Sequence, residues 1–161
     1  VINVSSPNTP QLRELQMTRP LMDIIEATLA RAGDTPVFVK LAPDLGDEDL
    51  QAAVEAAIEA GAAGIVATNT TLQRPGDTGA AGHQGGLSGA PLHPIARPRI
   101  LATLAAAAGR VPVVGVGGID SAAKVRDLLD AGCAAIQIYT AMIFEGPGLA
   151  RRINRELAAG R

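Results

Sequence analysis

The chain has 161 residues, of which 47% are hydrophobic and 19% charged, a composition typical of a soluble globular protein of one domain at most. A net charge of −2, an aromatic content of 2% and the lack of tryptophan argue against nucleic-acid binding, which usually needs a basic face or aromatic stacking surfaces. One cysteine, Cys133, excludes a disulfide framework and a multi-cysteine metal site, and no apolar run approaches the roughly 20 residues of a membrane helix.

Five short runs rich in apolar and β-branched residues predict five strands. They are VINV at residues 1–4, VFVKL at 37–41, AGIVA at 63–67, VPVVGV at 111–116 and AAIQI at 134–138. Segments of helical spacing alternate with them, at residues 19–32, 47–60, 93–108, 121–131 and 147–159. This alternation indicates an α/β fold with a parallel sheet that is covered on at least one face.

Two of the predicted helices carry boundary signals. Gly46 is followed by three acidic residues, 47–49, which the helix dipole favours in a first turn. Asp120 stands where an N-cap residue would precede the helix over 121–131, and Gly132 follows its end as a C-terminal glycine.

The polar and glycine-rich segments all follow the predicted strands. In chain order they are NVSSPNTP, KLAPD, TNTT, GVGGID and YTAMIFEGPG. Ligands of parallel α/β proteins bind at the carboxyl ends of the strands. We therefore expect a functional site on that side of the sheet.

Two of these segments contain polar side chains that suit a ligand. Lys40 lies in an otherwise apolar strand, so its charge needs an anion or a polar ring. An exposed lysine on an edge strand is the alternative. Thr68, Asn69 and Thr70 suit a planar, hydrogen-bonding ligand, although a plain Asx or Ser/Thr turn fits them equally well.

GVGGID, at residues 115–120, follows a strand and opens a helix. Glycines at such a turn let backbone N–H groups approach an anion, but the segment is neither GxGxxG nor a P-loop and is a weak signal alone. The next strand ends in Tyr139-Thr140 and leads into another helix. Loops after the last two strands, with the start of a short extra helix, frequently bind phosphate in (β/α)₈ barrels. We therefore expect a phosphate site here.

The interval between the third and fourth strands is unusually long, because it contains TLQRPGDTGAAGHQGGLSGAPL. Long glycine-rich loops in compact domains are usually functional or disordered. We interpret this segment as a loop that covers a ligand, with Gly89 close to it. His83 and His93 have no acidic or thiol partner at ligand spacing, so we expect surface residues rather than metal ligands and predict no metal site.

Six ordered motifs, which span essentially the whole chain, resemble the dihydroorotate dehydrogenase family. They are NVSSPNTPxLRxLQ, VFVKLAPDL, GIVATNTT, GGLSGxPL, VPVVGVGGIDS and AAIQIYTAMIFEGPG. With serine at position 6, the first motif resembles that of the quinone-linked, membrane-associated class. The soluble class characteristically has cysteine at this position. Gln11 stands where the family usually has glycine, so we expect the turn after Pro10 to differ.

The resemblance implies an FMN-binding (β/α)₈ TIM barrel that oxidises dihydroorotate to orotate in de novo pyrimidine (UMP) biosynthesis, with quinone as electron acceptor. Ser6 matches the catalytic base, which takes a proton while hydride passes to the flavin, and Thr9 is a hypothetical relay for that proton. Lys40 matches a flavin contact near the electron-rich edge of the ring. The other matched FMN contacts are Asn3, Thr68, Gly89, Gly118, Tyr139 and Thr140, and the matched substrate ligands are Asn3, Asn8, Asn69 and Thr70.

An eight-stranded barrel typically needs about 250 residues. We therefore expect residues 1–161 to form the C-terminal portion of a single FMN-binding barrel, about its last five strands, without the N-terminal strands and membrane helices. Quinone would then bind through that N-terminal part. We expect the parent protein to be peripheral, on the cytoplasmic side of the cell membrane. We expect this chain alone to be soluble and not to turn over substrate. Open sheet edges would favour self-association. A phosphate-binding part-barrel without redox activity and an inactive fragment are the alternatives.

Overall fold

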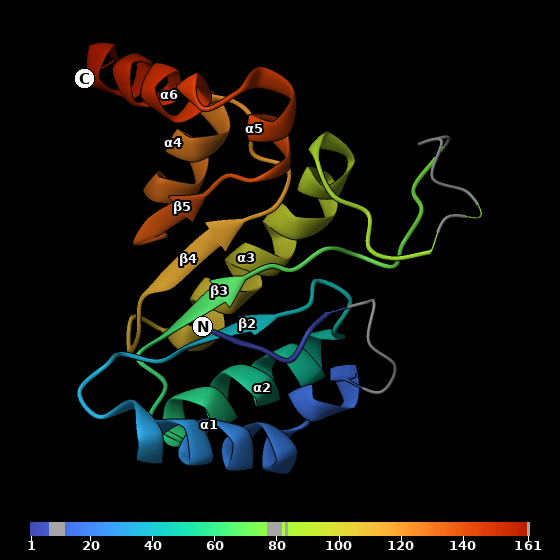
Figure 1. The fold of residues 1–161 in the computed structure, drawn as a ribbon, viewed down its shortest axis with the longest axis vertical. Coiled ribbons are helices and arrows are strands. Elements are labelled where there is room, and N and C mark those ends of the chain that lie inside the picture. The colour runs from blue at the N-terminus through green and yellow to red at the C-terminus, as the bar shows by residue number, and fades with distance from the viewer. Residues whose placement is uncertain (7–11, 77–81, 83, 161) are drawn as a thin grey trace.

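The structure is a computed structural model that describes residues 1–6, 12–76, 82 and 84–160. Five parallel strands form one sheet in which the strand order follows the chain (Figure 1). The strands are β1 (Ile2–Asn3), β2 (Phe38–Leu41), β3 (Gly64–Ala67), β4 (Val113–Val116) and β5 (Ala135–Gln137). The predicted parallel α/β sheet is therefore confirmed.

Helices connect the strands, and several of them pack against one another. α2 packs against both α1 and α3, and α4 packs against α6 (Figure 1). Because consecutive parallel strands are neighbours and such crossovers are right-handed, the connecting helices cover one face of the sheet. The bounds are α1 (Thr18–Ala32), α2 (Asp47–Glu59), α3 (His93–Ala107), α4 (Ala122–Asp130), α5 (Thr140–Glu145) and α6 (Gly148–Ala159), with 3₁₀ turns at Leu12–Gln16 and Ala90–Leu92.

Helix α2 shows how the local sequence produces this arrangement. Gly46 is its N-cap with extended backbone, and the acidic residues 47–49 occupy the first turn. Leu50, Val54 and Ala57 are buried at helical spacing, so one stripe of the helix faces the sheet.

The hydrophobic core lies between the sheet and these helices. Val39 and Leu41 on β2, Ile65 on β3 and Val113 on β4 are at most 1% exposed. They belong to one buried cluster that includes helix residues Ile25, Leu50, Ile100 and Leu128. Burial of such side chains stabilises the fold by about 1.5–3 kcal/mol each.

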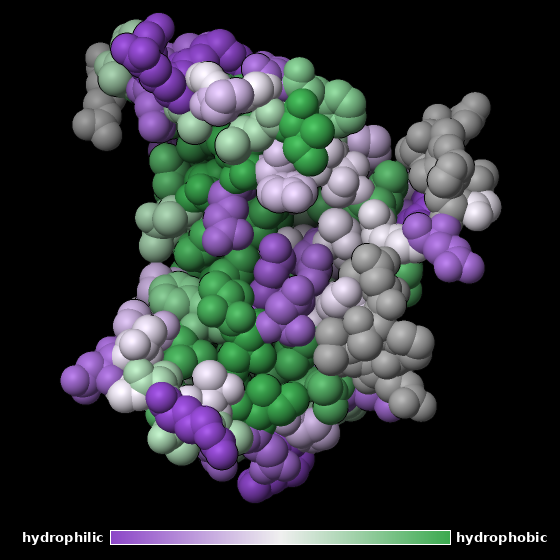
Figure 2. All heavy atoms as spheres, in the orientation of Figure 1, coloured by the Kyte–Doolittle hydropathy of each residue, from purple (hydrophilic) through white to green (hydrophobic). Residues whose placement is uncertain are grey.

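The opposite face of the sheet carries Lys40. In β2 the fully buried Val39 and Leu41 alternate with the half-buried Phe38 and Lys40, as the two-residue period of a strand requires. Figure 2 shows hydrophobic side chains gathered across the middle of the molecule, with hydrophilic groups among them.

The predicted cap of α4 is wrong. Ser121, not Asp120, is the N-cap residue, and its side chain makes no capping hydrogen bond. The carboxylate of Asp120 instead accepts a hydrogen bond from Lys124, 2.8 Å away and one turn further on. Gly132, with φ +112°, follows the C-cap Ala131 as predicted.

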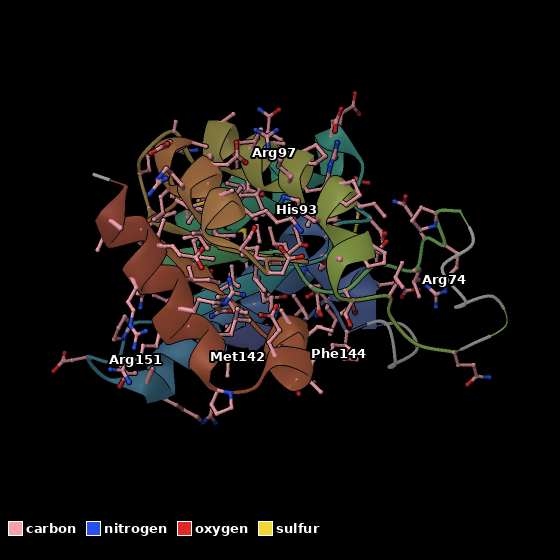
Figure 3. All side chains as sticks on the ribbon, turned by 90° about the horizontal axis from the view of Figure 1, so that it is seen from above. Arg74, His93, Arg97, Met142, Phe144 and Arg151 are labelled. Carbon is pink, nitrogen blue, oxygen red and sulfur yellow. The ribbon has the colours of Figure 1, made fainter. Side chains whose placement is uncertain are left out.

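The two outer strands, β1 and β5, each have a single strand neighbour in the described sheet. After β5 in the chain, α5 exposes the apolar side chains of Ile143 and Phe144, which are 67% and 84% accessible. Figure 3 shows Phe144 on this helix. Among the described residues, no helix is both long and apolar enough to cross a membrane.

Candidate functional site

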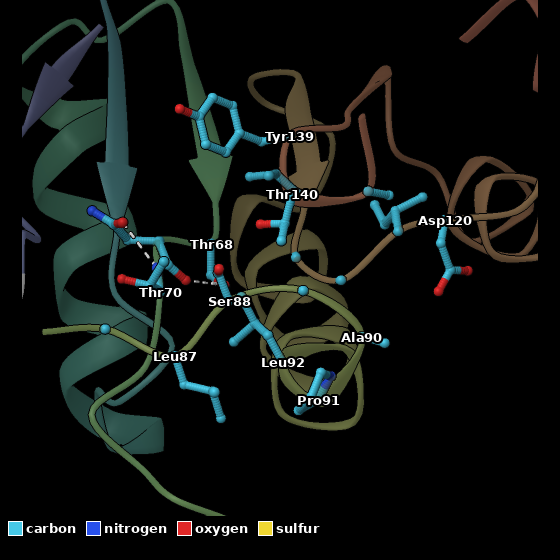
Figure 4. Close-up of a pocket in the computed structure, with 18 of the residues that line it drawn as sticks. Thr68, Thr70, Leu87, Ser88, Ala90, Pro91, Leu92, Asp120, Tyr139 and Thr140 are labelled. Carbon is cyan, nitrogen blue, oxygen red and sulfur yellow. Dashed lines mark hydrogen bonds between the residues drawn. The ribbon is translucent and has the colours of Figure 1, made fainter. Parts of the chain in front are cut away.

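A cavity of about 890 Å³ lies at the carboxyl ends of β2 to β5, where the sequence predicts a site. Figure 4 shows Thr68, Ser88 and Thr140 approaching it from three separate segments of the chain. Most of the residues predicted from the sequence line this one cavity: Lys40, Thr68, Asn69, Thr70, Gly89, Gly118, Tyr139 and Thr140.

Glycines let three segments meet at one end of the cavity. Gly118 has φ +63°, and a Cβ there would lie 2.5 Å from the carbonyl oxygen of Gly89 and 2.7 Å from the backbone nitrogen of His93. A Cβ on Gly89, which has φ +73°, would lie 3.2 Å from Cγ2 of Thr140. The long loop therefore lies against both the GVGGID loop and the start of α5, and the phosphate site expected from the loops after the last two strands stays a prediction.

Lys40 extends from β2 into the cavity lining. In the sheet it is opposite Asn3 of β1 and Val66 of β3. Burial lowers the pKa of its ammonium group below the ordinary lysine value. Within the described part of the chain, no carboxylate lies within ion-pair distance of Lys40, so its charge is available to a ligand.

A buried hydroxyl joins the polar ends of β1, β2 and β3. The amide nitrogen of Asn69 donates to Oδ1 of Asn3 (3.0 Å) and to Oγ of Ser5 (2.9 Å). Ser5 Oγ donates to the carbonyl oxygen of Lys40 at 2.7 Å, and Oδ1 of Asn69 accepts from the backbone N–H of Thr70 at 2.8 Å. This network uses both N–H donors of Asn69 and leaves the amide nitrogen of Asn3 for a ligand.

The long loop after β3 is closed at its base. Thr71 and Leu87 exchange backbone hydrogen bonds of 3.2 and 2.7 Å, and Asp44 accepts from the Thr71 hydroxyl. The guanidinium of Arg74 donates to the carbonyl oxygen of Gly85 at 2.5 Å. Residues 84 and 86–92 of the returning segment line the cavity, and the covering of a ligand by this loop stays a prediction.

Some predicted residues are not part of this lining. Asn3, a predicted FMN and substrate contact, is exposed and lies outside the lining, and its role stays a prediction. Ser6 follows Ser5 and is half-buried, and its catalytic role stays a prediction too. Asn8, Thr9, Gln11 and His83 lie outside the described residues.

His93 differs from the prediction of a surface residue. It is half-buried at the start of α3 (Figure 3), and its Nδ1 lies 3.0 Å from the carbonyl oxygen of Gly117. No group of three or more His, Cys, Asp or Glu side chains that could hold a metal is found in the described part of the chain.

Sequence reasoning missed three residues that shape the site. Ser5 joins the two asparagines, Arg74 holds the long loop, and Lys124 pairs with Asp120 in the cavity wall. Only Lys124 had a local signal, because a basic residue four positions after an acidic one is placed to pair with it on a helix.

Comparison with known proteins gives the same family over the whole chain. A family model described as dihydroorotate dehydrogenase matches residues 1–160. The chain is 49% identical over 164 residues to the dihydroorotate dehydrogenase (quinone) of Anaeromyxobacter dehalogenans strain 2CP-C, covering 98% of this chain and 45% of that protein. It is 48% identical over 161 residues to the enzyme of the same name from Halobacterium salinarum strain R1, covering 99% and 45%. The chain thus spans about half the length of these curated relatives.

Solved structures show the same fold. The ligand-free structure of DHODH from Eimeria tenella superposes with a TM-score of 0.89 at 35% identity, over 97% of this chain and 49% of that one. The complex of the same enzyme with ferulenol gives a TM-score of 0.87 at 34% identity, over 97% and 48%. The five-stranded sheet is therefore part of a (β/α)₈ barrel, as predicted. With a family model matched over residues 1–160 and curated relatives of one name at 48–49% identity, the chain belongs to the dihydroorotate dehydrogenase family, in its quinone-linked class.

Proposed function

We propose that the protein containing these residues oxidises dihydroorotate to orotate in de novo UMP biosynthesis, with FMN as cofactor and quinone as electron acceptor. The observation that carries this proposal is the convergence of separately predicted residues, from Lys40 to Thr140, on one cavity at the carboxyl ends of the strands. Family membership and the names of the relatives support the same reaction.

The cavity fits FMN in size and in chemistry. Its volume of about 890 Å³ suits a cofactor. Gly89, Gly118 and Thr140 gather at one end as a small-residue surface for phosphate, and Lys40 contributes an unpaired cation from β2. FMN, when bound, supplies an acceptor for the hydride.

The substrate would bind beside the serine network. Asn3, Asn69 and Thr70, with Asn8, are the proposed ligands, and an amide-rich surface suits a ring with carbonyl and carboxylate groups. Ser6 would remove the proton from the carbon next to the departing hydride. Because a serine hydroxyl is a poor base at its free pKa, the proton must be passed onward, and Thr9 is the proposed relay.

Flavin reduction tests the proposal directly. The protein expressed from its complete reading frame should contain FMN, and its visible flavin absorption should bleach on anaerobic mixing with dihydroorotate. Ser6→Ala should slow bleaching by about 100-fold or more with FMN content unchanged, because a positioned base contributes about that factor. Flavin that binds but is never bleached by dihydroorotate would contradict the proposal and favour a phosphate-binding barrel without redox activity.

The electron acceptor is tested separately. After bleaching, a soluble quinone analogue should restore the flavin absorption faster than fumarate or NAD⁺ at equal concentration. Faster recovery with fumarate or NAD⁺ would overturn the assignment of quinone as the acceptor.

A further inference from the structure

Two consecutive carbonyl groups of the GVGGID loop are held by side chains from neighbouring elements. The carbonyl oxygen of Gly117 lies 3.0 Å from Nδ1 of His93 on α3. The carbonyl oxygen of Gly118 accepts a hydrogen bond of 3.0 Å from Nζ of Lys124 on α4. A carbonyl oxygen can only accept, so the first contact requires the proton of His93 on Nδ1.

These contacts determine where the adjoining N–H groups point. In a trans peptide the N–H is opposite the C=O of the same unit, so the N–H groups of Gly118 and Ile119 point away from His93 and Lys124. Neither N–H donates to a protein acceptor within the described ranges. Both residues line the cavity, where two free backbone donors form a surface for an anion.

The charge of Lys124 also matters, because Asp120 lines the same cavity. An unpaired carboxylate there would repel a phosphate group. Burial raises the pKa of Asp120, but the hydrogen bond and the charge of Lys124, together with a hydrogen bond from Ser121 and the nearby His93, lower the pKa overall. Asp120 is therefore ionised at neutral pH, and Nζ of Lys124, 2.8 Å from its Oδ2, offsets the negative charge.

We propose that His93 and Lys124 are positioning residues for the phosphate group of FMN. They turn the Gly117 and Gly118 carbonyls away from the cavity, and Lys124 also neutralises Asp120. This inference rests on the proposed function only in taking FMN as the ligand. It predicts that both residues favour FMN over riboflavin, which has the same ring system but lacks the phosphate.

The test measures dissociation constants for FMN and riboflavin by flavin fluorescence, using flavin-free protein expressed from the complete reading frame. Lys124→Met should weaken FMN binding about tenfold or more, the usual effect of losing a charged hydrogen bond, with riboflavin binding unchanged. Lys124→Arg should retain most of the preference for FMN. Arg126→Met is the matched control, because Arg126 is also a cation of α4 but donates to the Leu157 carbonyl of α6.

A second pair of variants tests His93. His93→Leu should weaken FMN binding and leave riboflavin binding unchanged. His93→Asn should retain the preference, since an asparagine amide nitrogen can take the place of Nδ1. Asp120→Asn combined with Lys124→Met should recover part of the FMN affinity by removing the unpaired carboxylate.

The outcomes separate this inference from the proposed function. Equal losses for FMN and riboflavin in Lys124→Met and His93→Leu would show a merely structural role and overturn the inference. Unchanged FMN affinity in folded variants would overturn it too. A parent protein that binds neither flavin would instead overturn the proposed function.

Discussion

The hydroxyl oxygen of Ser5 links β2 to the loop after β3 at the candidate substrate site. Its side chain is fully buried, donates to the Lys40 carbonyl and accepts from the Asn69 amide. Ser5→Ala removes one hydrogen bond from each of these two partners at a fully buried position, so we expect the free energy of unfolding to fall by about 1–3 kcal/mol. We also expect the KM for dihydroorotate to rise, because the Asn69 amide loses one of the hydrogen bonds that hold its orientation.

Urea unfolding and steady-state kinetics check this prediction. Thr28→Ala is the control, because Thr28 also donates its hydroxyl to a backbone carbonyl at 2.7 Å but is half-buried within α1. Equal effects of the two substitutions on KM would show that Ser5 does not position the substrate ligands.

Lys40 gives a prediction about pH. Burial lowers the pKa of Lys40 in the folded protein, so the charged side chain decreases the free energy of unfolding. This decrease disappears as pH rises from the folded-state pKa to the higher unfolded-state pKa, because the side chain loses its proton over that range. In the flavin-free protein, Lys40→Met should therefore be more stable than the parent at pH 7. The difference should shrink in the alkaline range and become independent of pH above the ordinary lysine pKa of about 10.4. Denaturant unfolding across this range checks it, and a difference independent of pH would contradict it.

The predictability of these residues from the sequence depended on how local their signals are. Lys40 and Asn69 could be predicted because each stands out at the end of an apolar strand. Ser5 could not, because its partner is a carbonyl 35 positions away that only the parallel register of β1 and β2 brings near. The side-chain contact of His93 depends in the same way on the packing of α3 against the glycine loop.

At the scale of elements, the pairing of β2 and β3 depends on Gly64. A Cβ at Gly64 would fall against the ring of Phe38, within 2.7 Å of its Cδ1. Gly64→Ala forces the ring to move, so we expect a loss of about 1–3 kcal/mol in the free energy of unfolding. Phe38→Val in the same chain should recover part of that loss, because valine has no atoms beyond Cγ and so lacks the ring atoms that collide. Additive effects of the two substitutions in denaturant unfolding would contradict this account.

Sequence patterns predicted the number, type and order of the strands and of the long helices, but not their details. β2 and β3 each begin one residue later than predicted, because Val37 and Ala63 lie before the ladder that starts with Phe38 and Gly64. The bounds of α5 were not predicted, because a helix of six residues with exposed apolar side chains lacks the periodic buried stripe that identifies a helix. Asp120 was predicted as the cap because the sequence does not show whether its carboxylate accepts from a backbone N–H of the first turn or from the Lys124 side chain. The structure has the Lys124 contact.

At the scale of the whole molecule, the parallel sheet follows from the sequence pattern, and the barrel follows from the resemblance to the family. Alternation of strands and helices was enough to predict the parallel sheet, since each strand is buried by the helix that follows it. The chain covers 45% of its curated relatives and forms five strands whose outer members, β1 and β5, have one neighbour each in the described structure. Unpaired parallel edges of this kind readily pair with another chain.

We therefore expect residues 1–161, prepared as a separate chain, to self-associate in a concentration-dependent way. The open edge of β5 and the apolar side chains of Ile143 and Phe144 on α5 would both be removed from water by association. Ile143→Lys with Phe144→Lys should shift the equilibrium toward monomer, since burying the new charges is costly. Leu72→Lys, at an exposed position in the long loop, is the control. Size-exclusion chromatography with light scattering measures the mass directly, and a monomer at every concentration would contradict the prediction.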